Sequence, residues 1–155
     1  MSLLAVDLGI RTGFACYNRA GKLVWYRSHN YGSLARLRKG SSGQLAEISD
    51  LSVLVLEGGG QIADVWEREA TRRDLELIRT SAEVWRATLL YAREQRTGEQ
   101  AKAVADELAR RVIEWSDAPR PTSLRHDAAE AILLGLWAVV QLGWLAAIPP
   151  EVRRR

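Results

Sequence analysis

Near its start the chain reads Leu3-Leu4-Ala5-Val6-Asp7-Leu8-Gly9-Ile10-Arg11-Thr12-Gly13, an apolar run that ends in an acid and leads into a loop. A short apolar run bounded by a turn is typical of a buried strand, so we expect Asp7 where that strand meets water. Two later sites have the same character. Glu57 ends the apolar run 51–56 before three glycines, and Asp127 with Glu130 opens the last apolar segment.

The pattern around these sites predicts an α/β fold. Strands are expected at 13–18 and 22–31, joined by a hairpin turn at 18–21, and they form an antiparallel meander with 3–7. Residues 51–56 are apolar on both faces, as in a central strand, and 75–78 indicates a short fifth strand. The expected structure is one domain, 1–155, with a mixed five-stranded sheet flanked by helices.

The helices are predicted from periodicity and capping. Residues 61–74 show a charged helical pattern, and two helix starts are expected where the spacing matches a capping box, at Thr80 with Glu83 and at Thr97 with Gln100. Residues 33–50 are polar and contain Gly40-Ser41-Ser42-Gly43, which predicts a basic loop and a short helix.

The last apolar stretch, 131–148, has one polar residue, Gln141, and is long enough to raise the possibility of a membrane span. The two acids directly before it and the lack of a second such stretch favour a helix buried on the sheet and against a partner subunit. We therefore expect no membrane association.

Composition narrows the class of protein. The chain has 155 residues, of which 47% are apolar and 26% charged, as in an ordinary globular protein. The single cysteine, Cys16, cannot form an internal disulfide, which favours a reducing, cytoplasmic location. Arginine makes up 19 of the 22 basic residues, a bias that suits phosphate binding or equally reflects genome composition.

The three acidic sites predict a metal centre if they meet in the fold. Parallel strands bring their terminal residues to one edge of a sheet, and Asp127 and Glu130, three apart on a helix, share one face. Crowded carboxylates repel by roughly 4 kcal/mol per close pair, so cations are expected among them. Oxygen ligands favour Mg²⁺ or Mn²⁺, and two such ions support phosphodiester cleavage.

Each acid also has a plainer interpretation. Asp7 alone is typical of a turn or helix cap, and Asp127 and Glu130 suit a helix N-terminus because they oppose its macrodipole. Glu57 is harder to explain in this way, because a charge that ends an apolar strand is rarely buried unpaired.

Together these residues resemble the RuvC-type Holliday junction resolvases of the RNase H-like superfamily, in a compact form similar to a phage or divergent bacterial branch. The resemblance rests on three segments, residues 6–15, 54–58 and 126–131, whose order spans nearly the whole chain. It implies an RNase H-like fold and a homodimeric endonuclease that cuts four-way DNA junctions with two Mg²⁺ or Mn²⁺ ions per site.

The resemblance also implies roles for residues. The metal ligands would be Asp7, Glu57, Asp127 and Glu130, although the family usually has aspartate where this chain has Glu130. His126 would touch the scissile phosphate or a metal-bound water, unless it is simply a helix cap. The expected DNA contacts are Arg11, Thr12, Arg86, Lys102 and, in place of the family's aromatic junction wedge, Trp66, each of which is also an ordinary surface or core residue.

Two other functions remain open. A YqgF-like nuclease of the same superfamily would process RNA, and a catalytically silent nucleic-acid-binding protein would use the acids only to cap and brace the fold. Sugar kinases and chaperone ATPases also begin with an acidic phosphate loop, but their two-domain folds need a longer chain.

Overall fold

The computed structural model describes residues 1–153 and contains one mixed five-stranded sheet, in the order β3-β2-β1-β4-β5. Strands β1 to β3 pair antiparallel, whereas β4 and β5 run parallel to β1. The predicted meander and parallel strands are thus confirmed. The strands are β1 (Ser2–Asp7), β2 (Arg11–Asn18), β3 (Leu23–Asn30), β4 (Leu51–Glu57) and β5 (Glu76–Thr80).

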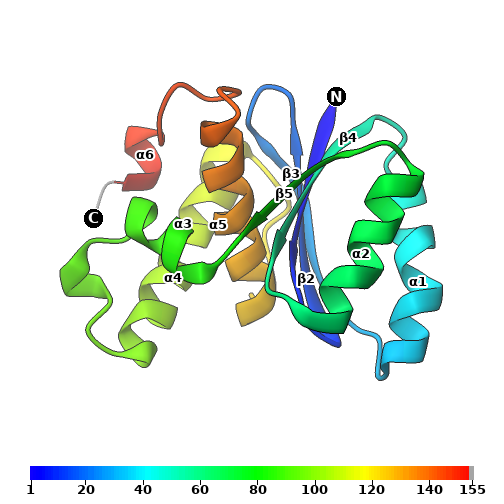
Figure 1. Ribbon diagram of the computed structural model, residues 1–155. Helices are drawn as coiled ribbons and strands as arrows, with labels where there is room; N and C mark the ends of the chain where they lie inside the picture. Colours follow the sequence, from blue (N-terminus) through cyan, green and yellow to red (C-terminus); the bar gives the residue numbers. More distant parts are fainter. Residues whose placement is uncertain (154–155) are drawn as a thin grey trace.

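Helices cover both faces of the sheet (Figure 1). One layer contains α1 (Leu34–Ala46) and α2 (Gly60–Arg72). The other contains α3 (Ala82–Leu89), α4 (Gly98–Ser116), α5 (His126–Gln141) and α6 (Pro150–Arg153), with a 3-10 turn η1 (Ala92–Glu94) between α3 and α4.

Strand alternation divides the hydrophobic core into two parts. Leu3 and Ala5 of β1 face the layer that contains α4 and α5, whereas Leu4 and Val6 face the layer that contains α1 and α2. Successive side chains of a strand point to opposite faces, so a strand covered on both sides must be apolar throughout. This explains the unbroken apolar run before Asp7.

The apolar helix α5 lies inside the chain's own core. All its residues from Ala128 to Val139 are buried. This part of the helix therefore has no exposed apolar stripe that would need a partner subunit. Gly135 allows a close approach, because a Cβ there would lie 2.3 Å from the ring of Tyr17. The helix ends at Gln141, before a left-handed turn at Gly143, and no helix within residues 1–153 is long and apolar enough to cross a membrane.

One prediction of secondary structure is only partly right. The segment expected to be a loop with a short helix forms the 13-residue helix α1, which continues through the glycine-serine stretch. The Ser33 hydroxyl caps this helix by accepting from the Arg36 backbone N–H at 3.2 Å. Gly40 lies against the ring of Tyr31, where a Cβ would be only 2.5 Å away. Tertiary packing therefore outweighs the low helix propensity of glycine and serine.

The two predicted helix starts have different outcomes. Thr97 caps α4 as expected, and its hydroxyl accepts from the Gln100 backbone N–H at 3.0 Å. Thr80 does not cap α3, because it is the last residue of β5 and the cap position falls on Ser81.

Candidate active site

Asp7 and Glu57 lie side by side at the carboxyl ends of two parallel strands. β1 and β4 are neighbours in register, with Asp7 opposite Glu57, and the Leu8 backbone N–H donates to the Glu57 carbonyl oxygen at 3.1 Å. Both side chains are half-buried. The edge of the sheet on which ligands bind in open α/β folds thus carries two adjacent acids.

The N-terminal turn of α5 lies over the same edge. Gly13 of β2 pairs with Asp7 across the sheet, and a Cβ on Gly13 would lie 2.0 Å from the Asp127 carbonyl oxygen. Glycine is therefore required at this position for the helix to approach the strand. The close approach brings Asp127 and Glu130 toward Asp7 and Glu57.

The electrostatics of Asp7 show that the four carboxylates act on one another. Burial, a hydrogen bond with Glu57 and the charge of Glu57 together raise the pKa of Asp7 to about 9, with further contributions from Glu130 and Asp127. Burial also raises the pKa of Glu130, against the opposing charge of Arg86. A group of acids that holds a proton in this way carries more negative charge than its surroundings neutralise.

Two consecutive residues of α3 hold two of these acids. The indole N–H of Trp85 donates to Glu57 Oε1, and Arg86 Nη2 donates to Glu130 Oε1 at 2.5 Å. Trp85 is fully buried, and the Arg86 side chain is 26% exposed. Sequence analysis assigned Trp85 no role, because a buried tryptophan on an amphipathic helix is indistinguishable from a core residue.

The acids on α5 have further partners. His126 Nε2 lies 3.0 Å from Glu130 Oε1, the oxygen that Arg86 also contacts. The Ser28 hydroxyl of β3 donates to Asp127 Oδ2 at 2.9 Å. Ser28 was missed by sequence analysis, because its role depends on the pairing of β3 with β2 and no local motif marks it.

The ligand atoms that the four acids offer suit a hard divalent cation. All four acids offer oxygen, which Mg²⁺ and Mn²⁺ prefer, and Glu130 Oε2 is buried without a hydrogen-bond partner. Within residues 1–153, however, no group of three or more His, Cys, Asp or Glu side chains is arranged as a preformed metal site. The carboxylates would have to converge further to share an ion.

Two of the expected DNA contacts are wrong. Trp66 is fully buried and packs edge-to-face on Phe14 with 5.6 Å between ring centroids, because the inward face of α2 includes it. Thr12 is also fully buried, and its hydroxyl donates to the Gly9 carbonyl oxygen at 2.7 Å to brace the loop after Asp7. Neither side chain is available to a ligand in this structure.

The remaining expected DNA contacts are accessible. Arg11 is exposed at the start of β2, on the edge that carries Asp7. Lys102 is exposed on α4, and within the described part of the chain no ion pair joins it to the four carboxylates. Arg86 is partly exposed and lies at the carboxylates themselves.

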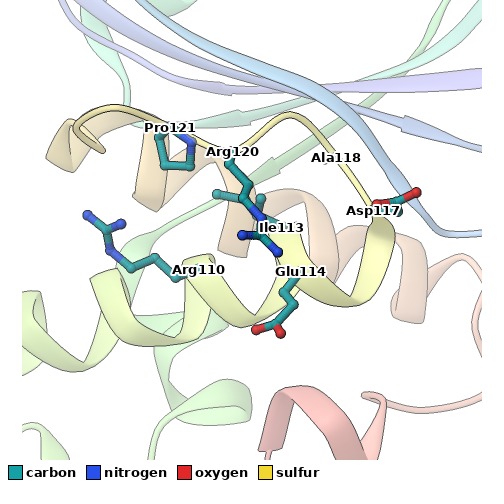
Figure 2. A pocket seen from close by; sticks show the side chains of 7 residues that line it. All are labelled: Arg110, Ile113, Glu114, Asp117, Ala118, Arg120 and Pro121. Atoms are coloured by element: carbon teal, nitrogen blue, oxygen red, sulfur yellow. The ribbon is translucent and has the colours of Figure 1, made fainter.

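A pocket of about 300 Å³ lies elsewhere, at the end of α4 and the loop after it (Figure 2). Its lining includes Arg110, Glu114 and Arg120 but none of the four acids or their partners. We therefore assign the candidate site to the sheet edge, on chemical grounds, and not to this cavity.

Comparisons with known proteins bear on the fold. No protein-family model and no curated protein matches the sequence. Among solved structures, RuvC of Thermus thermophilus in complex with a Holliday junction substrate matches with a TM-score of 0.61 and 13% identity, over 96% of this chain and 99% of that chain. This chain has the RuvC fold. A second Thermus thermophilus RuvC structure matches with a TM-score of 0.64 and 13% identity, over 92% of this chain and 97% of RuvC.

Proposed function

We propose that this protein is a divalent-metal-dependent endonuclease that resolves four-way DNA junctions. The observation that carries the proposal is that Asp7 and Glu57 are paired at the carboxyl ends of β1 and β4 while the first turn of α5, with Asp127 and Glu130, packs closely on β2 beside them. The RuvC fold supports it, since the matching RuvC structure contains a Holliday junction substrate.

In this proposal the four carboxylates bind two Mg²⁺ or Mn²⁺ ions. Such a pair, when bound, activates a water molecule and stabilises the leaving oxygen of the phosphodiester. Trp85 orients Glu57 through its indole N–H, and Ser28 orients Asp127 through its hydroxyl. We propose that His126, which is 44% exposed beside Glu130, contacts the substrate phosphate.

We also propose that the enzyme acts as a homodimer, because a four-way junction has two symmetric strands to cut. The apolar helix that first suggested a partner subunit supplies no support, since α5 is covered by its own chain. Sedimentation at micromolar concentration measures the oligomeric state directly.

The test is cleavage of a labelled four-way junction by the wild-type protein and by Asp7→Asn, with Mg²⁺ or Mn²⁺. We expect two symmetric nicks from the wild type and none from the variant. Equal products from both proteins, or none from either, would contradict the proposal. A structured RNA in parallel distinguishes the YqgF-like alternative, and junction binding without turnover identifies a silent binding protein.

A further inference from the structure

The helix α1 carries a net positive charge of its own. α1 carries Arg36, Arg38 and Lys39 and has no acidic residue. The formal net charge of the whole chain is +3, which equals the charge of this helix alone. Basic and acidic residues are therefore equal in number over the rest of the chain.

The three cations of α1 are exposed and unpaired. Within residues 1–153 none of them forms an ion pair or stacks on an aromatic ring. Seven of the fifteen other arginines within residues 1–153 pair with acids, as Arg79 does with Glu67 and Arg110 does with Asp106. Unpaired cations keep their full charge for a ligand, whereas paired ones are already neutralised.

α1 begins at the edge of the sheet that carries the acids. At that edge β2 pairs with β1 through Gly13 and Asp7, and it pairs with the end of β3 through Arg11 and Asn30. The chain then turns into α1, and the Tyr31 backbone N–H donates to the Ile10 carbonyl oxygen at 3.0 Å. Figure 1 shows α1 and α5 starting at the same end of the sheet.

Small residues surround the basic side chains on the outward face of α1. Residues three and four apart share a helix face, so Arg36, Lys39 and Gly43 lie in one row. A Cβ on Gly43 would meet no atom within 4 Å, and the exposed neighbours Ala35 and Ala46 are small. A sugar-phosphate backbone can therefore lie close to this helix without a large side chain in its path.

Arg38 extends the basic surface toward α2. It lines a groove of about 240 Å³ together with Arg68, another exposed arginine that has no ion pair within the described residues, and with Asp64. Arg36, Arg38 and Lys39 of α1 and Arg68 of α2 thus present unpaired cations on the face of the molecule that these two helices cover.

We propose that α1 binds the phosphate backbone of a duplex arm of the DNA junction, through Arg36, Arg38 and Lys39. This inference rests on the proposed function and adds a second contact to it, at the same end of the sheet as the acids but on the face that α1 and α2 cover. Duplex DNA carries one negative charge per about 1.7 Å of its axis, so it complements a helix that presents three unpaired cations.

The experiment measures how binding depends on salt. Fluorescence anisotropy is recorded with a labelled four-way junction in EDTA, over about 50 to 200 mM salt, for the wild type and for Arg36→Gln, Arg38→Gln and Lys39→Gln. Glutamine suits an exposed helical position, so the fold is retained and circular dichroism verifies it. Arg19→Gln is the matched control, since Arg19 lies in the β2–β3 turn at the opposite end of the sheet.

We expect each α1 variant to reduce the slope of log affinity against log salt by about 1, because each removes one phosphate contact. The triple variant should lose about 3 from the slope, and Arg19→Gln should keep the wild-type slope. Three results would overturn the inference. The α1 variants could keep the wild-type slope, Arg19→Gln could lose as much slope as they do, or the binding of the wild type could be insensitive to salt.

The result is separable from the test of activity. Junction cleavage by a wild-type protein whose α1 variants keep the full slope contradicts the role of α1 and leaves the nuclease intact. Reduced slopes with no cleavage by the wild type support the role of α1 and contradict the nuclease.

Discussion

Arg86 Nη2 lies 2.5 Å from Glu130 Oε1, and among residues 1–153 this is the one hydrogen bond that the guanidinium makes. Arg86 Nε is buried without a partner, so the side chain is held at the acids mainly by Glu130. The guanidinium of Arg86 thus places one positive charge where the proposed function requires divalent ions.

Replacing Arg86 should therefore strengthen metal binding. A guanidinium and a divalent cation compete for the same carboxylate, because like charges this close repel. We expect Arg86→Met to bind Mn²⁺ about tenfold more tightly than the wild type in the absence of DNA, a gain of about 1.4 kcal/mol. Calorimetry measures it, and Arg86→Lys, which keeps the charge, should resemble the wild type. Weaker Mn²⁺ binding by Arg86→Met would show that Arg86 positions Glu130 and does not compete for it.

Trp85→Phe should weaken metal binding, because it removes the indole N–H that holds Glu57. Loss of a hydrogen bond to a metal ligand typically costs about 10- to 100-fold in affinity. Trp66→Phe is a matched control, since Trp66 is equally buried but its indole N–H has no hydrogen-bond partner. Both changes disturb packing, and only Trp85→Phe should reduce Mn²⁺ affinity in calorimetry. An equal reduction in both variants would assign the effect to packing.

Asp7→Asn should stabilise the protein in EDTA at alkaline pH. Folding raises the pKa of Asp7 from 3.8 to about 9, so the stability that this group contributes is full below 3.8 and is lost as the pH rises to about 9. The melting temperature of the wild type should thus fall between pH 5 and pH 9 more steeply than that of Asp7→Asn. In a chain of this size, 1 kcal/mol shifts the melting temperature by about 2–4 °C.

Two further measurements complete this test. Glu76→Gln, which changes an exposed acid at the other end of β5, should follow the wild-type pH profile. Mn²⁺ should raise the melting temperature of the wild type more than that of Asp7→Asn. Matching pH profiles for wild type and Asp7→Asn would contradict a cluster of interacting acids.

Gly13→Ala should destabilise the protein and separate the acids. The added Cβ would lie 2.0 Å from the Asp127 carbonyl oxygen, so α5 has to move away from β2. Overpacking of this kind costs about 1–3 kcal/mol. Gly43→Ala in α1 is the control, because its Cβ meets open space and alanine favours a helix by about 1 kcal/mol. Urea unfolding should give opposite signs for the two variants.

Cys16 should be inert toward thiol reagents in the folded protein. Burial raises the pKa of its thiol to about 12, and only 4% of the residue is exposed. Thiolate is the reactive form, so Ellman's reagent at pH 8 should show almost no reaction until guanidinium is added. Rapid reaction in native buffer would show that β2 opens locally.

The strands and the acidic edge were predictable from sequence, because both depend on local signals. The apolar runs before Asp7 and Glu57 mark strands covered on both faces, and a parallel pair necessarily brings their ends together. The full length of α1 was not predictable, since its glycines and serines favour a loop, whereas in the fold Gly40 packs on Tyr31 within a continuous helix.

The residues that contact the acids could not be predicted from sequence for a similar reason. Ser28, Trp85 and Arg86 reach the acids only after three separate elements have packed around the sheet edge. The expectation that Trp66 contacts DNA is wrong because Trp66 lies on the buried face of α2, at helical spacing with Ala63 and Ala70. Its position opposite Phe14 is fixed by the fold.

β1 lies in the middle of the sheet, with a paired strand on each side and a helical layer on each face, and it carries Asp7 at its end. A strand in this position is among the last parts of a protein to open by local fluctuation. The residue proposed to do the chemistry is thus mounted on a strand that stays paired on both sides when the peripheral helices fray.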